Sequence, residues 1–238
     1  MKTLVVIVSV ALLGLLSNAA FASSDRQESV DRLQNSANVL HEIMAAPDKG
    51  IPEEVLESAK CIVVVPHLIK AGFIVGGKHG RGVATCRVST GWSAPAFISV
   101  GGGTWGLQIG VEGIDLVMLI MNDRGLQHLL SSKFELSGEG SAAAGPVGRH
   151  ASAGTDWKLN TEVLTYSRSK GVFAGITLEG AVVEQDDDST RAIYGRKVSF
   201  RTALTGRVHS PASAAPFMTA VSGASAKASL HEAKENQK

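Results

Sequence analysis

The longest apolar run after the N-terminus, Phe97 to Asn122, changes its pattern halfway along. Leu107, Ile109 and Val111 alternate with polar residues or glycines, which is the two-residue period of a strand with one buried face. From Ile114 to Met121 almost every position is apolar, so we expect both faces of that part to be covered. Glycines inside the run would weaken a helix. We therefore predict strands, with the glycines at bends or bulges of a curled sheet.

The segment Ser24 to Ala46 has a helical period instead. Its apolar positions are three or four residues apart and form one stripe: Val30, Leu33, Ala37, Leu40 and Met44. This spacing predicts an amphipathic helix. Its polar face mixes both signs of charge, with Asp25, Arg26, Glu28, Asp31, Arg32 and Glu42. Because that face is not basic, we favour a helix docked on a sheet over a helix lying on a membrane.

Other segments show strand patterns. Runs of apolar and β-branched residues occupy Cys61–Val65, Val83–Val88, Ala96–Val100, Thr161–Ser167 and Gly171–Glu184. We expect the first to stop at Pro66, which cannot donate a ladder hydrogen bond. Phe73 to Val88 predicts a hairpin whose glycine-rich tip carries basic residues, and the last two runs predict a second hairpin. The fold class that follows is α+β: a curled, mostly antiparallel sheet or partial barrel, with the N-terminal helix and short helices packed on it.

Shorter helices and loops complete this picture. Pro52 with the two acids after it predicts a short second helix, and further helical turns are expected at Leu126–Ser132, Ser199–Leu204 and Ala212–Val221. The run Asp186–Asp188 is interpreted as a solvated acidic turn, without the pattern of a calcium loop. Residues 133–156 are rich in Gly, Ala and Ser and fit either a surface loop or small-residue strands. From Ser222 to the end we predict disorder.

The first 22 residues have the pattern of a secretory signal peptide. Lys2 gives a positive start, Leu4 to Leu16 is almost continuously apolar, and Ala20-Phe21-Ala22 is a small-x-small cleavage site. We therefore expect cleavage after Ala22 and export to the periplasm or the medium. Residues 23–221 then suit a single domain.

Charge and cysteine content limit the partners and the compartment. The chain has 23 basic and 22 acidic residues, and loss of Lys2 with the signal makes the numbers equal, so no global field attracts nucleic acid. Cys61 and Cys86 are the two cysteines. In an oxidising compartment a disulfide between them is expected, with two buried free thiols as the alternative.

Sequence patterns of catalysis are weak. Gly101 to Gly106 matches the glycine pattern of a dinucleotide loop, but a strand pattern follows where that site needs a helix. The chain has no G-x-S-x-G motif, and its histidines lack metal-binding spacing. Glu112 and Asp115 are an odd number of residues apart in a predicted strand, so they face opposite ways and are poor acid–base partners. We expect no enzymatic activity, catalytic residue, metal or cofactor.

The remaining candidates are basic residues around the first predicted hairpin. Lys70 precedes it, and Lys78, His79 and Arg81 lie on the glycine-rich tip. Glycines let backbone N–H groups approach an anion, and Lys or Arg supplies charge, so this tip suits a phosphate headgroup. The alternative is an ordinary soluble turn.

A series of short motifs resembles the SYLF-domain family, from about Ser29 to Val221. In chain order they are Ala59-Lys60, Pro66-His67-Leu68-Ile69-Lys70-Ala71-Gly72-Phe73, Gly76-Gly77 with Gly80-x-Gly82, Gly91-Trp92-Ser93-Ala94-Pro95, Gly106-Leu107-Gln108-Ile109-Gly110, Tyr166-Ser167-x-Ser169-x-Gly171-x-Phe173-Ala174-Gly175 and Tyr194-Gly195. The resemblance implies a lipid-binding module. Eukaryotic members of this family are associated with phosphoinositides, through basic residues and an N-terminal amphipathic helix, and some members bind actin filaments.

The resemblance suggests Lys70, Lys78 and Arg81 as lipid-binding positions. The predicted signal peptide would place this chain away from cytoplasmic actin and phosphoinositides, and its first helix is charge-balanced rather than basic. The leading hypothesis is an exported, non-enzymatic module that contacts anionic lipid headgroups or a membrane surface. The competing hypothesis is a structural or protein-interaction domain of the cell envelope, whose partner protein docks on the apolar stripe of residues 24–46.

Overall fold

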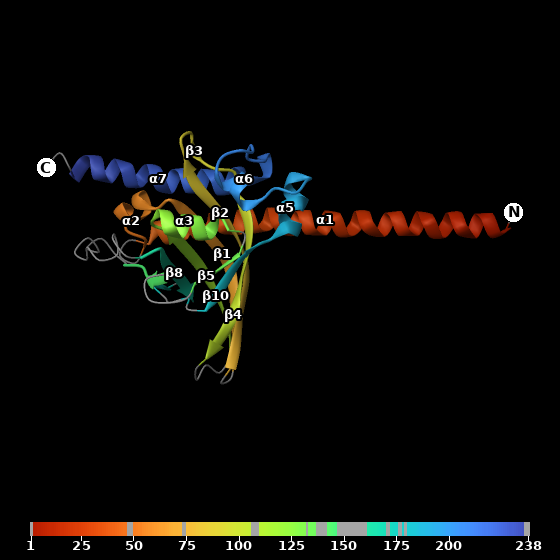
Figure 1. The fold of residues 1–238 in the computed structure, drawn as a ribbon, viewed down its shortest axis with the longest axis horizontal. Coiled ribbons are helices and arrows are strands. Elements are labelled where there is room, and N and C mark those ends of the chain that lie inside the picture. Colours follow the sequence, from red (N-terminus) through yellow and green to blue (C-terminus); the bar gives the residue numbers. More distant parts are fainter. Residues whose placement is uncertain are drawn as a thin grey trace.

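The computed structural model describes most of the chain. The described residues are 2–46, 50–72, 75–105, 110–131, 133–136, 142–146, 161–169, 172–175, 178 and 180–235. A long helix, α1 (Lys2–Ala45), begins far from the body and reaches it with its second half (Figure 1). Among the described helices, none combines the length and the apolar content that a membrane span requires.

The body is built around one curled sheet. Its strands are β1 (Cys61–Gly72), β2 (Val75–Val88), β3 (Gly91–Trp92), β4 (Ala96–Trp105), β5 (Gly110–Ile120), β6 (Lys133–Leu136), β7 (Ala142–Ala144), β8 (Val163–Ser169), β9 (Val172–Gly175) and β10 (Ala181–Gln185). The order across the sheet is β6-β10-β4-β2-β1-β5-β8-β7, with β3 on β2 and β9 on β8. Only the β7–β8 pair is parallel among the described pairs. The predicted α+β class with a mostly antiparallel sheet is confirmed.

The β1–β2 hairpin forms the centre of the sheet, but two predictions about it were wrong. Strand β1 continues through Pro66 to Gly72, and a bulge takes up the proline: the register shifts between Val64 and Ile69 on the β2 side. A bulge leaves a residue out of the ladder, so the missing N–H of a proline costs little there. Residues 76–82 belong to strand β2 rather than to a turn. The basic residues therefore lie along a strand, where alternate side chains face opposite sides of the sheet.

The run Phe97 to Asn122 forms two strands, as its period predicts. They are β4 and β5, and they flank the central hairpin, because β4 pairs with β2 while β5 pairs with β1. The fully apolar half is buried as expected from Leu116 to Ile120. Val111 is 77% exposed, so its predicted burial was wrong, and Leu107 and Ile109 lie outside the described residues.

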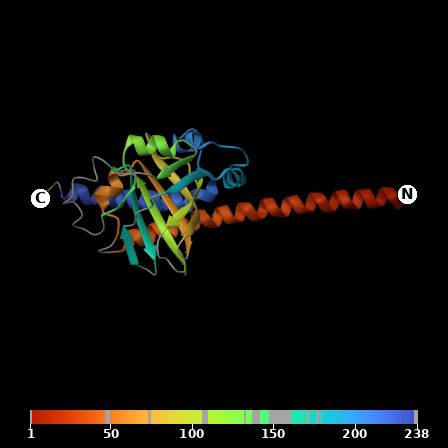
Figure 2. The same cartoon turned by 60° about the horizontal axis from the view of Figure 1, so that its bottom comes forward.

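Helices cover both faces of the sheet, and each covered face has its own core. The first face, here called the α1 face, packs against α1, α2 (Glu53–Ser58) and α7 (Ala215–Glu235), with Ile62, Val64 and Phe97 in the sheet. The opposite face, here called the α6 face, packs against α3 (Asp123–Leu129) and α6 (Phe200–Leu204). Figures 1 and 2 show α7 beside α1 and running in roughly the same direction.

The apolar stripe of α1 lies inside the α1-face core. Leu33 and Leu40 are fully buried, and Ile43 joins them. The stripe was correctly assigned to a helix docked on a sheet. The competing idea, that a partner protein docks on this stripe, was wrong, because the sheet and α7 already cover it.

The C-terminal segment contains more helix than the sequence predicts. A 3-10 turn, η2 (Ala212–Ala214), leads into α7, which continues to Glu235. Val221 and Ala224 are buried in the α1-face core. The segment after Ser222, which the sequence predicts to be disordered, is therefore helical up to Glu235.

Two further predictions concern pairing. Cys61 and Cys86 are directly opposite in the β1–β2 register and form a disulfide, which confirms the expected bridge. The second predicted hairpin is present as β8 and β9. Strand β10 does not belong to this hairpin. It pairs with β4 and β6 near the opposite edge of the sheet. Residues 137–141 and 147–156, most of the undecided Gly/Ala/Ser-rich segment, lie outside the described residues.

Candidate functional site

Two of the three predicted lipid-binding residues come together on the central hairpin. Lys70 of β1 and Lys78 of β2 are directly opposite in the register, so their side chains project from the same face of the sheet. Counting along β1 from Leu68, a core residue of the α6 face, places this lysine pair on the α6 face. On the other side of β1, Glu112 of β5 is the cross-strand partner of Lys70. This acid offsets part of the repulsion between the two lysines.

A glycine of β4 lets Lys78 lie close to the sheet. Gly102 pairs with Lys78, and a Cβ atom at position 102 would lie 3.1 Å from Lys78 Cε and 2.5 Å from the carbonyl oxygen of Gly180. Any larger residue would displace the lysine stem or the backbone. Gly102 therefore allows close packing beside Lys78, which is 6% exposed.

Arg81 is separated from the lysine pair because it projects from the α1 face. Its Nη1 donates to Glu28 Oε1 of α1 at 2.7 Å, and its Nε lies 3.4 Å from Asp186 Oδ2. The three basic residues were predicted as one set. The structure divides them between the two faces of the sheet.

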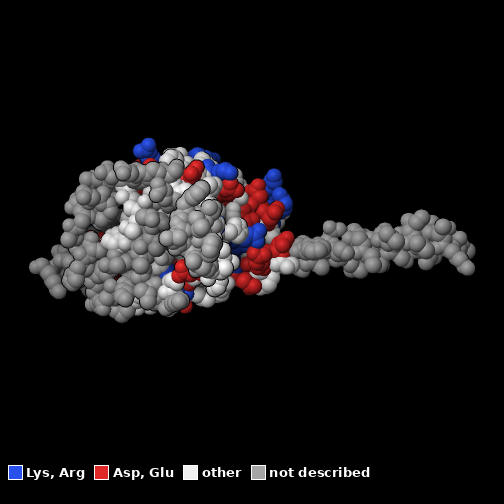
Figure 3. All heavy atoms as spheres, turned by 90° about the horizontal axis from the view of Figure 1, so that it is seen from below, with Lys and Arg blue, Asp and Glu red and all other residues white. Residues whose placement is uncertain are grey.

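A buried ion pair joins α1 to the start of α5 (Asp187–Tyr194). Arg32 Nη1 donates to Asp186 Oδ2 at 2.9 Å, and the two side chains are 5% and 6% exposed. Asp186 also caps α5 by accepting from the Ser189 backbone N–H. Two predictions were therefore wrong: Arg32 is not on the solvated face of α1, and Asp186 is not part of a solvated turn. Figure 3 shows acidic and basic side chains interleaved on the surface where α1 reaches the body.

Glu28, Arg32, Arg81 and Asp186 form one ion-pair cluster. Their surroundings favour the charged form of its two acids, Glu28 and Asp186. Burial alone would raise the pKa of Asp186, but the amide and hydroxyl of Ser189 and the guanidinium of Arg32 hold that pKa below its usual value. The pKa of Glu28 is also lowered, chiefly by its hydrogen bond from Arg81. A carboxylate with a lowered pKa stabilises the fold above its unfolded pKa, and this contribution disappears as the pH falls through the folded value.

We expect the free energy of unfolding to depend on pH through this cluster. Asp186→Asn, which mimics the protonated acid, should be less stable than the wild type above about pH 5, where unfolded Asp and Glu are ionised. The difference should shrink as the pH falls below about 4. Urea unfolding followed by circular dichroism from pH 7 to pH 2.5 measures it, with Asp188→Asn as the exposed control. A difference that stays constant over this range would contradict the assignment.

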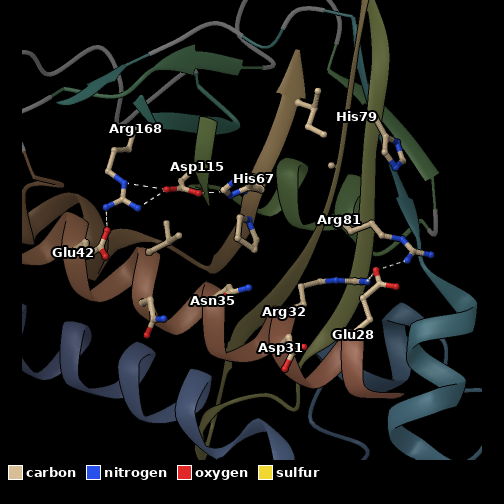
Figure 4. A pocket seen from close by; sticks show the side chains of 15 residues that line it. Glu28, Asp31, Arg32, Asn35, Glu42, His67, His79, Arg81, Asp115 and Arg168 are labelled. Atoms are coloured by element: carbon tan, nitrogen blue, oxygen red, sulfur yellow. Dashed lines mark hydrogen bonds and ion pairs between the residues drawn. The ribbon is translucent and has the colours of Figure 1, made fainter. Parts of the chain in front are cut away.

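A groove runs along α1 between the Arg32–Asp186 cluster and a second cluster, formed by Arg168, Glu42 and Asp115 (Figure 4). Its volume is about 520 Å³, and its walls are α1, the β1 bulge and β2. At the far end Arg168 pairs with Glu42 and donates from Nε to Asp115 Oδ2 at 3.0 Å. The backbone N–H of His67 donates to the other oxygen of Asp115 at 3.1 Å. His67 and Asn35 lie between the two clusters, and His79 lies above Arg81 in the same view (Figure 4).

Comparison with known proteins places the chain in a family. The family model Ysc84, described as Las17-binding protein actin regulator, matches residues 101–224, which is more than half of the chain. The chain belongs to the Ysc84 (SYLF) family. The match extends from β4 into α7, so it includes Asp186, Arg168 and the glycines beside Lys78.

Curated Ysc84 relatives are longer proteins. SH3 domain-containing YSC84-like protein 1 of Rattus norvegicus is 36% identical over 170 residues, which cover 71% of this chain and 50% of the relative. Protein YSC84 of Saccharomyces cerevisiae is 32% identical over 193 residues, covering 79% and 41%. LAS seventeen-binding protein 3 of the same species is 33% identical over 174 residues, covering 71% and 38%. The chain thus spans half or less of the length of these relatives.

Sequence patterns could not identify most of the groove residues of this Ysc84 chain. Arg32 and Asp186 are 154 positions apart, and each has an ordinary local setting. His67 carries a weak signal, because it follows a proline inside an otherwise regular strand. Among the described residues, no group of three His, Cys, Asp or Glu side chains is arranged to hold a metal ion.

Proposed function

We propose that this chain is an exported, non-enzymatic module that contacts anionic lipid headgroups through Lys70 and Lys78. The observation that carries the proposal is the cross-strand position of the two lysines on one face of the sheet. They lie near the end of the β1–β2 hairpin, which extends beyond the helices (Figure 1). Lys70 is the more exposed of the two and would make the direct contact, while Lys78, which is 6% exposed, adds positive charge beneath it.

Export is supported by two features. The N-terminal residues have the order of a signal peptide, with Lys2, an apolar run and Ala20-Phe21-Ala22. The Cys61–Cys86 disulfide is typical of proteins that leave the reducing cytoplasm.

Flotation with liposomes tests the lipid proposal. The protein should float with vesicles that contain phosphatidylglycerol and not with pure phosphatidylcholine vesicles. Lys70→Ala should lower partitioning about fivefold, since one lysine near an anionic surface contributes about 1 kcal/mol. Added salt should weaken binding by the wild type. Lys197→Ala, which removes an exposed lysine outside the hairpin, is the matched control. Equal binding to both vesicles, or none, would contradict the proposal.

A protein partner is the second candidate, and the comparisons favour it. The family description names a Las17-binding actin regulator, and one relative is named for Las seventeen binding. For this chain we propose that a protein partner would use a surface other than the apolar stripe of α1, because Leu33 and Leu40 are buried.

A further inference from the structure

The groove along α1 has the form of a built binding site. It lies on the α1 face, separate from the lysine pair, and its volume of about 520 Å³ is typical of ligand sites. Glu28 and Glu42 mark its two ends and are 14 residues apart on α1, which corresponds to about 21 Å along a helix. An extended chain of about six residues has the same length.

The middle of the groove is apolar on one side and rich in hydrogen-bonding groups on the other. Ile69 is 48% exposed, although it is a large apolar residue, and Pro66 and the almost buried Val39 also line the groove. The amides of Asn35 and Asn38 on α1 face the same space. An amide can donate to a carbonyl and accept from an N–H, which are the two groups that a peptide backbone presents.

The two ends are charged and internally paired. The lining contains four carboxylates and three guanidiniums: Glu28, Asp31, Glu42, Asp115, Arg32, Arg81 and Arg168. Each guanidinium contacts at least one of these carboxylates. The set has only one more carboxylate than guanidiniums, so it creates no strong field for a phosphate and favours a ligand with little net charge.

The bulge that forms one wall is strained. His67 has φ = 60°, the only positive value at a non-glycine residue in the part of the chain that the structure describes. A histidine in the left-handed region costs free energy and persists only where its surroundings enforce it. Here Pro66 and the hydrogen bond from the His67 N–H to Asp115 fix the backbone of the bulge. The imidazole of His67 lies at the groove (Figure 4). Such strain is concentrated at functional sites.

We propose that this groove binds an extended peptide segment of about six residues, with one branched apolar side chain against Ile69, Val39 and Pro66. The asparagines of α1 pair with the peptide backbone, and the charged ends limit its length. A saccharide fits less well, because none of the lining residues is Phe, Tyr or Trp, the large aromatic rings on which sugars commonly stack. This site goes beyond the lipid contact proposed above and does not depend on it.

The test uses a phage-displayed library of random seven-residue peptides, selected against the full chain. Selected peptides should share a central Leu, Ile or Val. Their binding, measured by fluorescence polarisation, should weaken at least tenfold with Ile69→Ser and severalfold with Asn35→Ala. Val111→Ser is the matched control, because Val111 is an exposed β-branched residue that does not line the groove. Its affinity should equal that of the wild type.

A second measurement locates the bound peptide. In NMR spectra the imidazole signals of His67 and His79 should shift on addition of the peptide, while those of His128 and His209, outside the groove lining, should not. The proposal is overturned if no common peptide is selected, or if binding is insensitive to both groove variants. It is also overturned if maltohexaose, and no peptide, shifts the signals of His67 and His79.

Discussion

Asp186→Ala is expected to lower the free energy of unfolding by about 3–5 kcal/mol, because it leaves the buried guanidinium of Arg32 without its closest charged partner. Arg32 is 5% exposed, so water cannot replace the carboxylate easily. Its other ion-pair partner is Glu28, which is half exposed and shared with Arg81. The same change removes the side chain that caps α5. Urea unfolding at pH 7, followed by circular dichroism, measures the loss.

Two further variants distinguish the loss of the Arg32–Asp186 ion pair from nonspecific destabilisation of the fold. Asp188→Ala removes a largely exposed acid of the same helix and should change stability by less than about 0.5 kcal/mol. Arg32→Met with Asp186→Ala removes both charges, and it should be more stable than Asp186→Ala alone, because no unpaired buried charge remains. A loss below about 1 kcal/mol for Asp186→Ala would contradict this account.

Reduction of the Cys61–Cys86 disulfide is expected to cost roughly 3–4 kcal/mol, the loop-closure value for the 25-residue separation. The bridge joins the first residue of β1 to β2. Without it the unfolded chain gains freedom, while the strands keep their other contacts. Urea unfolding of the wild type with and without a phosphine reductant measures the difference.

The control for this experiment is a chain without the bridge. Cys61→Ala with Cys86→Ala should show one unfolding midpoint, unchanged by the reductant and close to that of the reduced wild type. An equal midpoint for the oxidised and the reduced wild type would contradict the prediction. Alkylation followed by mass measurement gives an independent check, because the native oxidised protein should take up no label.

Local patterns predicted the elements well. The spacing of apolar residues from Val30 to Met44 was enough to define the inner face of α1, and alternation after Phe97 was enough to assign strands. Short-range chemistry was less exact about element boundaries: helical turns were predicted at Leu126–Ser132, whereas α3 spans Asp123–Leu129 and is capped by the side chain of Asn122. These signals depend on neighbours within one or two turns, so they can be detected without a fold.

The same local reasoning misplaced features that depend on the register of the strands. Glycines at residues 76–82 resemble a turn, yet they lie inside β2. Gly80 and Gly82 face Val65 and Val64 of β1 so closely that a Cβ atom at either position would clash. Pro66 resembles a strand end, yet a bulge carries β1 past it. Whether a glycine or a proline breaks a strand depends on the strand beside it, and that neighbour comes from elsewhere in the chain.

The sequence by itself determined the α+β class, the inner face of α1 and the family, and it predicted a disulfide that the register of β1 and β2 confirms. Only the tertiary structure decided which basic residues act together. Pairing of β1 with β2 brings Lys70 and Lys78 to one face, and strand alternation sends Arg81 to the other. Asp186, between β10 and α5, meets Arg32, which is 154 residues away in the chain. Such contacts depend on the path of the whole chain, and each residue's local surroundings contain no information about that path.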